Sequence, residues 1–214
     1  MNRRILGRFL TATLSLALLA FAPFVRAADE APDALIKRVS TEVLDAIKAD
    51  KAIQSGDTNG VLALVDTKVM PNVNFIRMTA SAVGRNWRQA TPEQKTRLQN
   101  EFKTLLIRTY SGALSQVREQ TLNVKPLRAA SADNEVVVRT EVIGRGDPVQ
   151  LDYRMEKTPS GWKIYDLNVL GVWLVETYRT QFAEEISAKG VDGLIASLAQ
   201  RNKSNANTGG KKSS

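Results

Sequence analysis

The 214-residue sequence contains no cysteine and no histidine. Without cysteine there is no disulfide bond, no thiolate nucleophile, no lipid anchored through a cysteine and no cysteine-ligated metal. Without histidine, every catalytic triad that uses histidine as its base is excluded, together with most zinc sites. We therefore expect no metal and no cofactor, and any catalytic chemistry must come from other side chains.

The central part of the chain also lacks an excess of either charge. The formal net charge is +8, but all 22 acidic residues lie between Asp29 and Asp192, together with 22 of the 30 Lys and Arg residues. The other basic residues lie near the two ends: Arg3, Arg4, Arg8, Arg26, Arg201, Lys203, Lys211 and Lys212. A neutral body provides no broad basic field, so we expect no nucleic-acid partner.

The two ends differ from the body in composition. Arginines precede an apolar run of 13 residues, Phe9–Phe21, and Val25-Arg26-Ala27 fits a cleavage site between Ala27 and Ala28. This pattern is typical of a secretory signal peptide, and a membrane anchor would need an apolar run of about 20 residues. We predict a signal peptide at residues 1–27, a single domain at residues 28–200 and a disordered polar tail at residues 201–214.

The first half of the domain has the apolar spacing of α-helices. A first helix is expected to start at Pro32, a second to run from about Asp57 to Met70, and a third from Phe75 to Trp87. Thr91-Pro92-Glu93-Gln94 then has the residues of a capping box, with proline at the first helical position. The apolar stripe that follows it persists to Val117 and predicts a long fourth helix.

From Gln120 onward the apolar period changes from 3.6 to 2, which is typical of strands. Four antiparallel strands are expected, at about residues 122–124, 136–142, 149–156 and 162–170. The alternation breaks at Ile164 and Tyr165, which indicates a bulge or burial on both faces. A long helix is expected after Gly171, with a stop at Gly190 and a short helix over Val191–Leu198. This order predicts an α+β fold with helices packed on one face of a curled antiparallel sheet of about four strands.

Two residues in this region are functional candidates. Trp173 lies almost opposite the apolar stripe of the last helix if that helix begins at Gly171, so we expect it to face a portal or a partner. Asp166 interrupts an apolar strand, where a buried carboxylate could act as a general base. The favoured interpretation is that Asp166 pairs with an arginine such as Arg154 or Arg179, or caps a neighbouring segment, because no second acid or base is spaced to assist it.

A series of short segments extends over about residues 35–198. The segments are Val69-Met70-Pro71-Asn72-Val73, Trp87 with Ala90-Thr91-Pro92-Glu93-Gln94-Lys95, Phe102 with Tyr110, Pro148-Val149-Gln150-Leu151-Asp152-Tyr153, Gly161-Trp162-Lys163-Ile164-Tyr165-Asp166, Gly171-Val172, Tyr178-Arg179 with Gln181-Phe182, and Lys189-Gly190-Val191-Asp192-Gly193-Leu194. In this order they resemble the periplasmic phospholipid-carrier family of the Mla pathway, the MlaC-type or toluene-tolerance proteins.

The resemblance implies a cone of sheet and helices, similar in shape to nuclear transport factor, that holds phospholipid tails between the two layers. It implies a periplasmic carrier that moves lipid between an outer-membrane lipoprotein–porin complex and an inner-membrane ABC transporter with an MCE-domain subunit. Such transport maintains the lipid asymmetry of the outer membrane. The family has no catalytic residues to transfer, so we expect a non-enzymatic monomer with phospholipid as its cargo.

Within this expected architecture, candidate roles for individual residues follow from their positions on the apolar helices and strands. The expected lining of the apolar cavity is Phe75, Met78, Trp87, Phe102, Leu106, Tyr110, Val138, Leu151, Tyr153, Met155, Trp162, Val172, Tyr178 and Phe182. The arginines of the apolar helices, Arg77, Arg85 and Arg108, are candidates for the headgroup phosphate. The chain departs from many family members at Leu170 and Trp173, which are therefore candidates for a portal or partner contact.

Two alternatives remain open on the sequence alone. One is a small-substrate isomerase or dehydratase of the same cone shape, which requires an isolated Asp166 carboxylate inside the cavity. The other is a periplasmic protein-binding module with a solid core, because the aromatic residues taken alone are ordinary core residues. The packing around these side chains distinguishes the three readings.

Overall fold

The structure is a computed structural model that describes residues 30–128 and 133–209. The predicted signal peptide at residues 1–27 lies outside this part of the chain, as do residues 210–214. The helices are α1 (Pro32–Ala49), α2 (Lys51–Gln54), α3 (Thr58–Leu64), α4 (Phe75–Val83), α5 (Pro92–Leu114) and α6 (Leu174–Gly209). The strands are β1 (Thr121–Val124), β2 (Glu135–Ile143), β3 (Val149–Thr158), β4 (Gly161–Val169) and β5 (Val172–Trp173).

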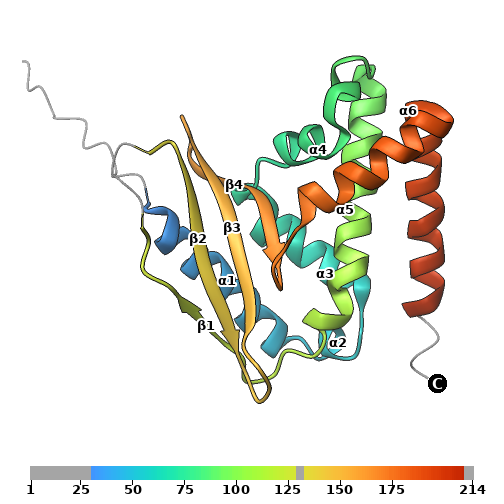
Figure 1. Cartoon of the computed structure of the whole chain (residues 1–214). Helices are drawn as coiled ribbons and strands as arrows, with labels where there is room; N and C mark the ends of the chain where they lie inside the picture. The colour runs from blue at the N-terminus through green and yellow to red at the C-terminus, as the bar shows by residue number, and fades with distance from the viewer. Residues whose placement is uncertain (1–29, 129–132, 210–214) are drawn as a thin grey trace, which may run out of the picture.

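The predicted α+β class is confirmed, with one more strand than expected. The sheet is antiparallel throughout, in the order β1-β2-β3-β4-β5. Figure 1 shows the sheet on one side of the molecule, α1 behind it, and α5 and α6 on the opposite side. The added strand, β5, is formed by Val172 and Trp173, which pair with the end of β4.

The start of α5 follows from local chemistry. The Thr91 side chain accepts a hydrogen bond from the Gln94 N–H at 3.2 Å, and the Gln94 side chain accepts one from the Thr91 N–H at 3.0 Å. The predicted capping box is thus confirmed, and it satisfies backbone donors that have no partner inside the helix. The helix ends at Leu114 instead of continuing to Val117.

Two other predicted helices are interrupted. The helix expected to reach Met70 changes at Val65 into a π-helical turn, η1 (Val65–Val69), and then into a 3-10 turn, η2 (Met70–Asn72). The Pro71 ring has no N–H and cannot continue an α-helix. The helix expected to reach Trp87 ends at Val83, because Gly84 has a φ of 66°, and a 3-10 turn, η3 (Gly84–Arg88), follows.

A β-bulge in β4 sets the two faces of the sheet. Met155 pairs with Ile164 and Arg154 pairs with Asp166, so Tyr165 is the extra residue. Of the two predicted explanations, a bulge or burial on both faces, the structure shows the bulge, and it reverses the alternation of β4. As a result Leu167 shares a face with Tyr153, while Asp166 shares the opposite face with Arg154.

The interior is divided into three apolar clusters. One joins α4, α5 and α6; the second lies between α1 and strands β2, β3 and β4; the third joins the end of α1 to α2, α3 and α5. The sheet is therefore connected by apolar packing to α1 and, through the half-buried Leu167 and Val169 of β4, to the helical cluster, whereas α5 packs mainly with other helices. This division leaves the sheet and α5 as separate walls of the interior.

The predicted disordered tail is wrong for residues 201–209, because α6 extends to Gly209. Gly190, with φ 71° and ψ −178°, kinks this helix. Beyond the kink, the Asn202 side-chain amide donates to the Glu101 carbonyl oxygen at 2.9 Å and to its carboxylate at 2.7 Å. Asn202 is buried, so this segment docks on α5 through contacts that composition does not reveal.

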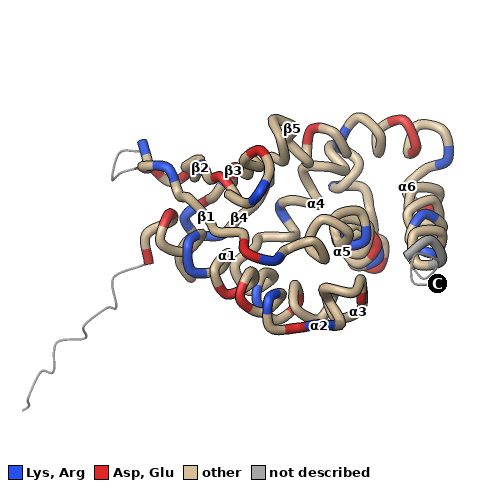
Figure 2. The backbone as a smooth tube through the Cα atoms, turned by 90° about the horizontal axis from the view of Figure 1, so that it is seen from below, with Lys and Arg blue, Asp and Glu red and all other residues tan. Residues whose placement is uncertain are grey.

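Charged residues of both signs are distributed over the described part of the chain. Figure 2 shows basic and acidic residues interspersed along the described chain, in keeping with the equal numbers counted in the body of the sequence. Among the described helices, none combines the length and the apolar character needed to cross a membrane.

Candidate functional site

The largest predicted cavity residues form a close-packed cluster between α4, α5 and α6. The Phe102 ring, which is fully buried, lies 5.8 Å from Phe75, 4.9 Å from Tyr178 and 5.2 Å from Phe182 between ring centroids. Met78 belongs to the same cluster. Rings at these distances and tilts stabilise one another and leave no space between them for a ligand. In this structure these rings are packed in the hydrophobic core between the helices and do not line a cavity.

A second group of predicted residues is buried between the sheet and α1. Val138 and Met155 are fully buried, and Trp162 is 9% exposed. These side chains pack with Leu35, Ile36 and Val39 of α1. Their burial attaches α1 to the sheet, so this part of the inner face is already covered by protein.

The remaining predicted residues are half-buried apolar side chains on two walls of the interior. Trp87, Leu106 and Tyr110 belong to the helical wall, and Leu151 and Tyr153 to the sheet wall. Burial raises the pKa of the Tyr110 hydroxyl and that of the Tyr153 hydroxyl. Apolar surface that is only partly covered on facing elements is the kind of surface on which an acyl chain can be buried.

Sequence reasoning missed two residues of the sheet wall, Leu167 and Val169. Both are half-buried, and they pair with Tyr153 and Leu151 on the inner face. Their odd numbers set them out of phase with Trp162, and the break in alternation at Ile164 and Tyr165 left open a bulge or burial on both faces, so neither was assigned to the cavity. The bulge at Tyr165 was the signal that could have placed them correctly.

Val172 was expected inside the cavity, and this is wrong. Val172 is 52% exposed and Leu170 is 65% exposed, on either side of Gly171 in the turn from β4 to β5. Leu170 has a φ of 53°, which a non-glycine residue rarely adopts. The turn directs both side chains outward, so exposure is consistent with a portal or partner role for Leu170.

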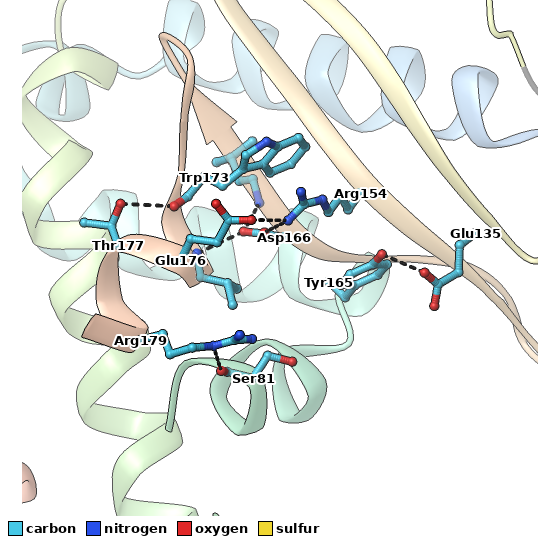
Figure 3. Close-up of polar contacts among 11 residues, drawn as sticks. Ser81, Glu135, Arg154, Tyr165, Asp166, Trp173, Glu176, Thr177 and Arg179 are labelled. Carbon is cyan, nitrogen blue, oxygen red and sulfur yellow. Dashed lines mark hydrogen bonds and ion pairs between the residues drawn. The ribbon is translucent and has the colours of Figure 1, made fainter. Parts of the chain in front are cut away.

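Trp173 does not lie on α6, because that helix begins only at Leu174. It lies on β5, and the Arg154 guanidinium carbon is 3.9 Å from its ring centroid. Figure 3 shows Trp173 beside Arg154, with Thr177 donating a hydrogen bond to the Trp173 carbonyl oxygen. The tryptophan is half-buried by this stacking, so the expectation of a helical residue on the solvent side is corrected.

Asp166 is paired on every side. Its carboxylate accepts hydrogen bonds from the Leu167 N–H at 2.8 Å and the Val175 N–H at 3.1 Å, and it forms an ion pair with Arg154 at 3.0 Å. Burial raises the pKa of this carboxyl above its ordinary value, against the effect of these donors. The side chain caps α6 and lies on the sheet face opposite Leu167, so the isolated cavity carboxylate that the enzyme alternative requires is not present here.

The three candidate headgroup arginines are dispersed. Arg77 forms ion pairs with Glu135 at 2.7 Å and with Glu156 at 2.5 Å, and Arg108 donates to the Asn202 carbonyl oxygen. Arg85 is exposed on the turn after α4. The structure therefore does not bring the three together, and two of them already hold partners.

Two surface hollows are lined mostly by polar and charged residues and lie away from the apolar walls. One, of about 610 Å³, lies where the end of α5 meets β1 and β2 and includes Arg118 and Arg145. The other, of about 450 Å³, lies inside the bend of α6 and includes Glu185 and Arg201. Neither contains a predicted cavity residue. Within residues 30–128 and 133–209, no group of three or more acidic side chains is gathered where it could hold a metal ion.

Comparison with known proteins matches this α+β fold to a class of phospholipid-binding proteins. The sequence model of the family described as MlaC protein matches residues 37–200. The chain is 28% identical over 178 residues to the toluene tolerance protein ttg2D of Pseudomonas putida, with 83% of each chain covered. It is 23% identical over 177 residues to the intermembrane phospholipid transport system binding protein MlaC of Haemophilus influenzae, covering 81% of this chain and 83% of that one.

A solved structure is also similar. The phospholipid-binding protein from Ralstonia solanacearum, determined in complex with a phospholipid, is 50% identical, with a TM-score of 0.80 over 84% of this chain and 99% of that chain. The chain belongs to the MlaC family, and the resemblance drawn from the sequence segments is confirmed.

Proposed function

We propose that this protein is a periplasmic phospholipid carrier that buries acyl chains between the half-buried apolar walls of the sheet and α5. The observation that carries the proposal is that half-buried apolar side chains occur on two separate elements, Leu106 and Tyr110 on α5 and Leu151 and Tyr153 on β3, which lie on opposite sides of the molecule in Figure 1. The phospholipid-binding protein from Ralstonia solanacearum, which is 50% identical to this chain, was solved with a phospholipid bound, which supports the same cargo here.

The energetics of phospholipid explain why such a protein is needed. The two tails expose about 30 methylenes, and burial of each contributes about 0.8 kcal/mol. Passage of a free lipid through water is therefore very slow. A carrier that covers the tails needs apolar walls and no reactive nucleophile near the ester bonds, which suits a chain without cysteine or histidine.

The proposal extends to location and partners. A signal peptide at residues 1–27, cleaved near Ala27-Ala28, would export the chain to the periplasm, where it acts as a monomer and not as an enzyme. The partners are an outer-membrane lipoprotein–porin complex and an inner-membrane ABC transporter with an MCE-domain subunit. The family membership supports this pathway, and exchange between the two sites would maintain outer-membrane lipid asymmetry.

Mass spectrometry of the intact protein tests the proposal. Protein exported in a bacterium and purified without detergent is expected to carry the mass of one or more phospholipids, which denaturation removes. Leu106→Asp places a charge on the helical wall and should abolish the lipid-bound species. Ala113→Asp, an exposed position on the same helix, is the matched control and should retain it. Equal lipid content in the two variants would refute the proposed site.

A further inference from the structure

The sheet and the helical layer are joined on the outer face by two arginines, each of which holds two carboxylates. Arg77 of α4 forms ion pairs with Glu135 of β2 and Glu156 of β3. Arg154 of β3 forms ion pairs with Asp166 of β4, at 3.0 Å, and Glu176 of α6, at 3.2 Å. We call these six residues the sheet–helix latch: Arg77, Glu135, Arg154, Glu156, Asp166 and Glu176.

Aromatic rings hold the arginines of the latch in place. The Arg77 guanidinium carbon lies 3.6 Å from the centroid of the Tyr165 ring, whose hydroxyl donates to Glu135 at 3.0 Å. Trp173 stacks on Arg154 in the same way. Figure 3 shows Glu176 and Asp166 meeting at Arg154, and Tyr165 pointing toward Glu135. Stacked and doubly paired guanidinium groups have little freedom to move to new partners.

The latch connects two bodies that are each packed internally. α4 and α6 belong to one body, since Phe75 and Phe182 lie in one cluster and the Arg179 Nε donates to the Ser81 carbonyl oxygen at 2.9 Å. The sheet and α1 form the other body through their own apolar cluster. The walls of the proposed lipid site belong to different bodies, so ion pairs that join these bodies on the outer face limit how far the walls can separate.

Directional contacts fix a spacing more sharply than apolar contacts do. Hydrogen bonds and ion pairs weaken steeply as their donors and acceptors separate, whereas apolar packing is non-directional. Among the pairs that cross between the bodies, Arg77 and Glu156 have side chains that are only 31% and 18% exposed, so solvent screens this pair less than an exposed one. The latch therefore resists separation of the sheet from α4 and α6.

We infer that Arg77 and Arg154 are positioning residues for carrier activity, and that their ion pairs control how fast phospholipid enters and leaves. This inference rests on the proposed function. With the latch closed, the half-buried walls stay near one another and retain the tails. When it opens, the sheet moves away from the helices and the tails can leave for a membrane or a partner.

The first test compares lipid transfer by matched variants. Protein loaded with a fluorescent phosphatidylethanolamine is mixed with vesicles of phosphatidylethanolamine and phosphatidylglycerol, and the transfer rate is measured. The double variant Arg77→Gln/Arg154→Gln should transfer lipid about tenfold faster, since each 1.36 kcal/mol removed from a barrier is about tenfold in rate. Its lipid content after purification should equal that of the wild type.

Arg38→Gln is the control for loss of a doubly paired arginine. Arg38 pairs with Glu30 at 2.8 Å and Glu42 at 3.3 Å, but all three lie at or near α1 and none bridges the two bodies. Its transfer rate should equal that of the wild type. A loaded double variant that transfers no faster than Arg38→Gln overturns the latch and leaves the proposed function intact.

A disulfide tests the inference without removing the latch. Val73 and Ile164 are partners in a parallel bridge between the segment before α4 and β4. Because the chain has no other cysteine, Val73→Cys/Ile164→Cys provides a single defined crosslink. Oxidation should slow lipid transfer several-fold and reduction should restore it. Equal rates in the two states overturn the inference; protein that neither carries phospholipid nor takes it up from vesicles overturns the proposed function as well.

Discussion

Asp166 shows how one side chain can explain several local features. Its carboxylate accepts from the Leu167 and Val175 N–H groups and pairs with Arg154, which fixes the start of α6 relative to β4. Burial raises its pKa, so its charged form is less stable in the folded protein than in the unfolded chain. The position is thus structural, and its stabilising effect comes from the contacts that it organises.

Two substitutions of Asp166 distinguish its role as an acceptor for backbone N–H groups from the role of its negative charge. Asp166→Ala removes the side-chain acceptor of two backbone N–H groups and the partner of Arg154, and we expect it to lower the free energy of unfolding by about 3 kcal/mol. Asp166→Asn keeps an oxygen that can accept from both N–H groups, so the loss should be about 1–2 kcal/mol. Urea unfolding followed by circular dichroism measures both values. Two variants as stable as the wild type would contradict the capping role.

The pKa of Glu135 is shifted in the opposite direction from that of Asp166, so the stability that Glu135 contributes should be lost at low pH. The hydrogen bond from Arg77 lowers the pKa of its carboxyl below the ordinary 4.5, with a further contribution from the Tyr165 hydroxyl. Its stabilising contribution is therefore present above the unfolded pKa and is lost as the pH falls through the folded pKa. We expect Glu135→Gln to show a smaller fall in melting temperature from pH 5 to pH 3 than the wild type, at low salt. An identical fall would show that Glu135 adds nothing at these pH values.

At the scale of elements, backbone conformation decides where helices bend. Gly190 has φ 71° and ψ −178°, a conformation that is almost exclusive to glycine, and no atom lies within 4 Å of the position of an added Cβ. The requirement at Gly190 is therefore conformational and not steric. The bend directs the second part of α6 back along α5, where Asn202 contacts Glu101.

A pair of glycine substitutions tests this account. Gly190→Ala should lower the free energy of unfolding by about 1–2 kcal/mol, because alanine is strained at this φ. Gly112→Ala, inside α5 where an added Cβ also meets open space, should raise it by about 0.5–1 kcal/mol. Thermal or urea unfolding checks both. A Gly190→Ala protein as stable as the wild type would show that the bend does not depend on glycine.

The sequence predicted the elements whose signals are local. The capping box before α5 and the bulge at Tyr165 depend on neighbouring residues, and both were predicted. The start of α6 was misplaced because it depends on the Val175 N–H reaching Asp166, a contact that follows from the β4–β5 turn. The pairing of Asp166 with Arg154 was among those predicted. The pairings of Arg77 could not be predicted, since it meets carboxylates 58 and 79 residues away in the chain.

At the scale of the whole molecule, the division of the core explains which predicted site residues can meet a ligand. The family and the class of cargo could be predicted from the order of the sequence segments. The sequence did not distinguish large apolar residues that are fully packed in the core from those that could contact a lipid. In the structure Phe102 and Met155 are fully buried in separate clusters, whereas Leu106 and Tyr153 remain half-buried on facing walls. Sequence periodicity reports which face of an element is apolar, but only the packing of several elements determines how fully that face is covered.

The most direct test of the central claim locates the acyl chains inside the protein. The wild-type protein is loaded with a phospholipid that carries a photoreactive diazirine near the end of one tail, irradiated, and mapped by peptide mass spectrometry. The account predicts labelling of Leu106, Tyr110, Leu151 or Tyr153, suppressed by an excess of unlabelled phospholipid. Labelling confined to the polar hollow beside Arg118 and Arg145, or to the outer surface of α6, would contradict it.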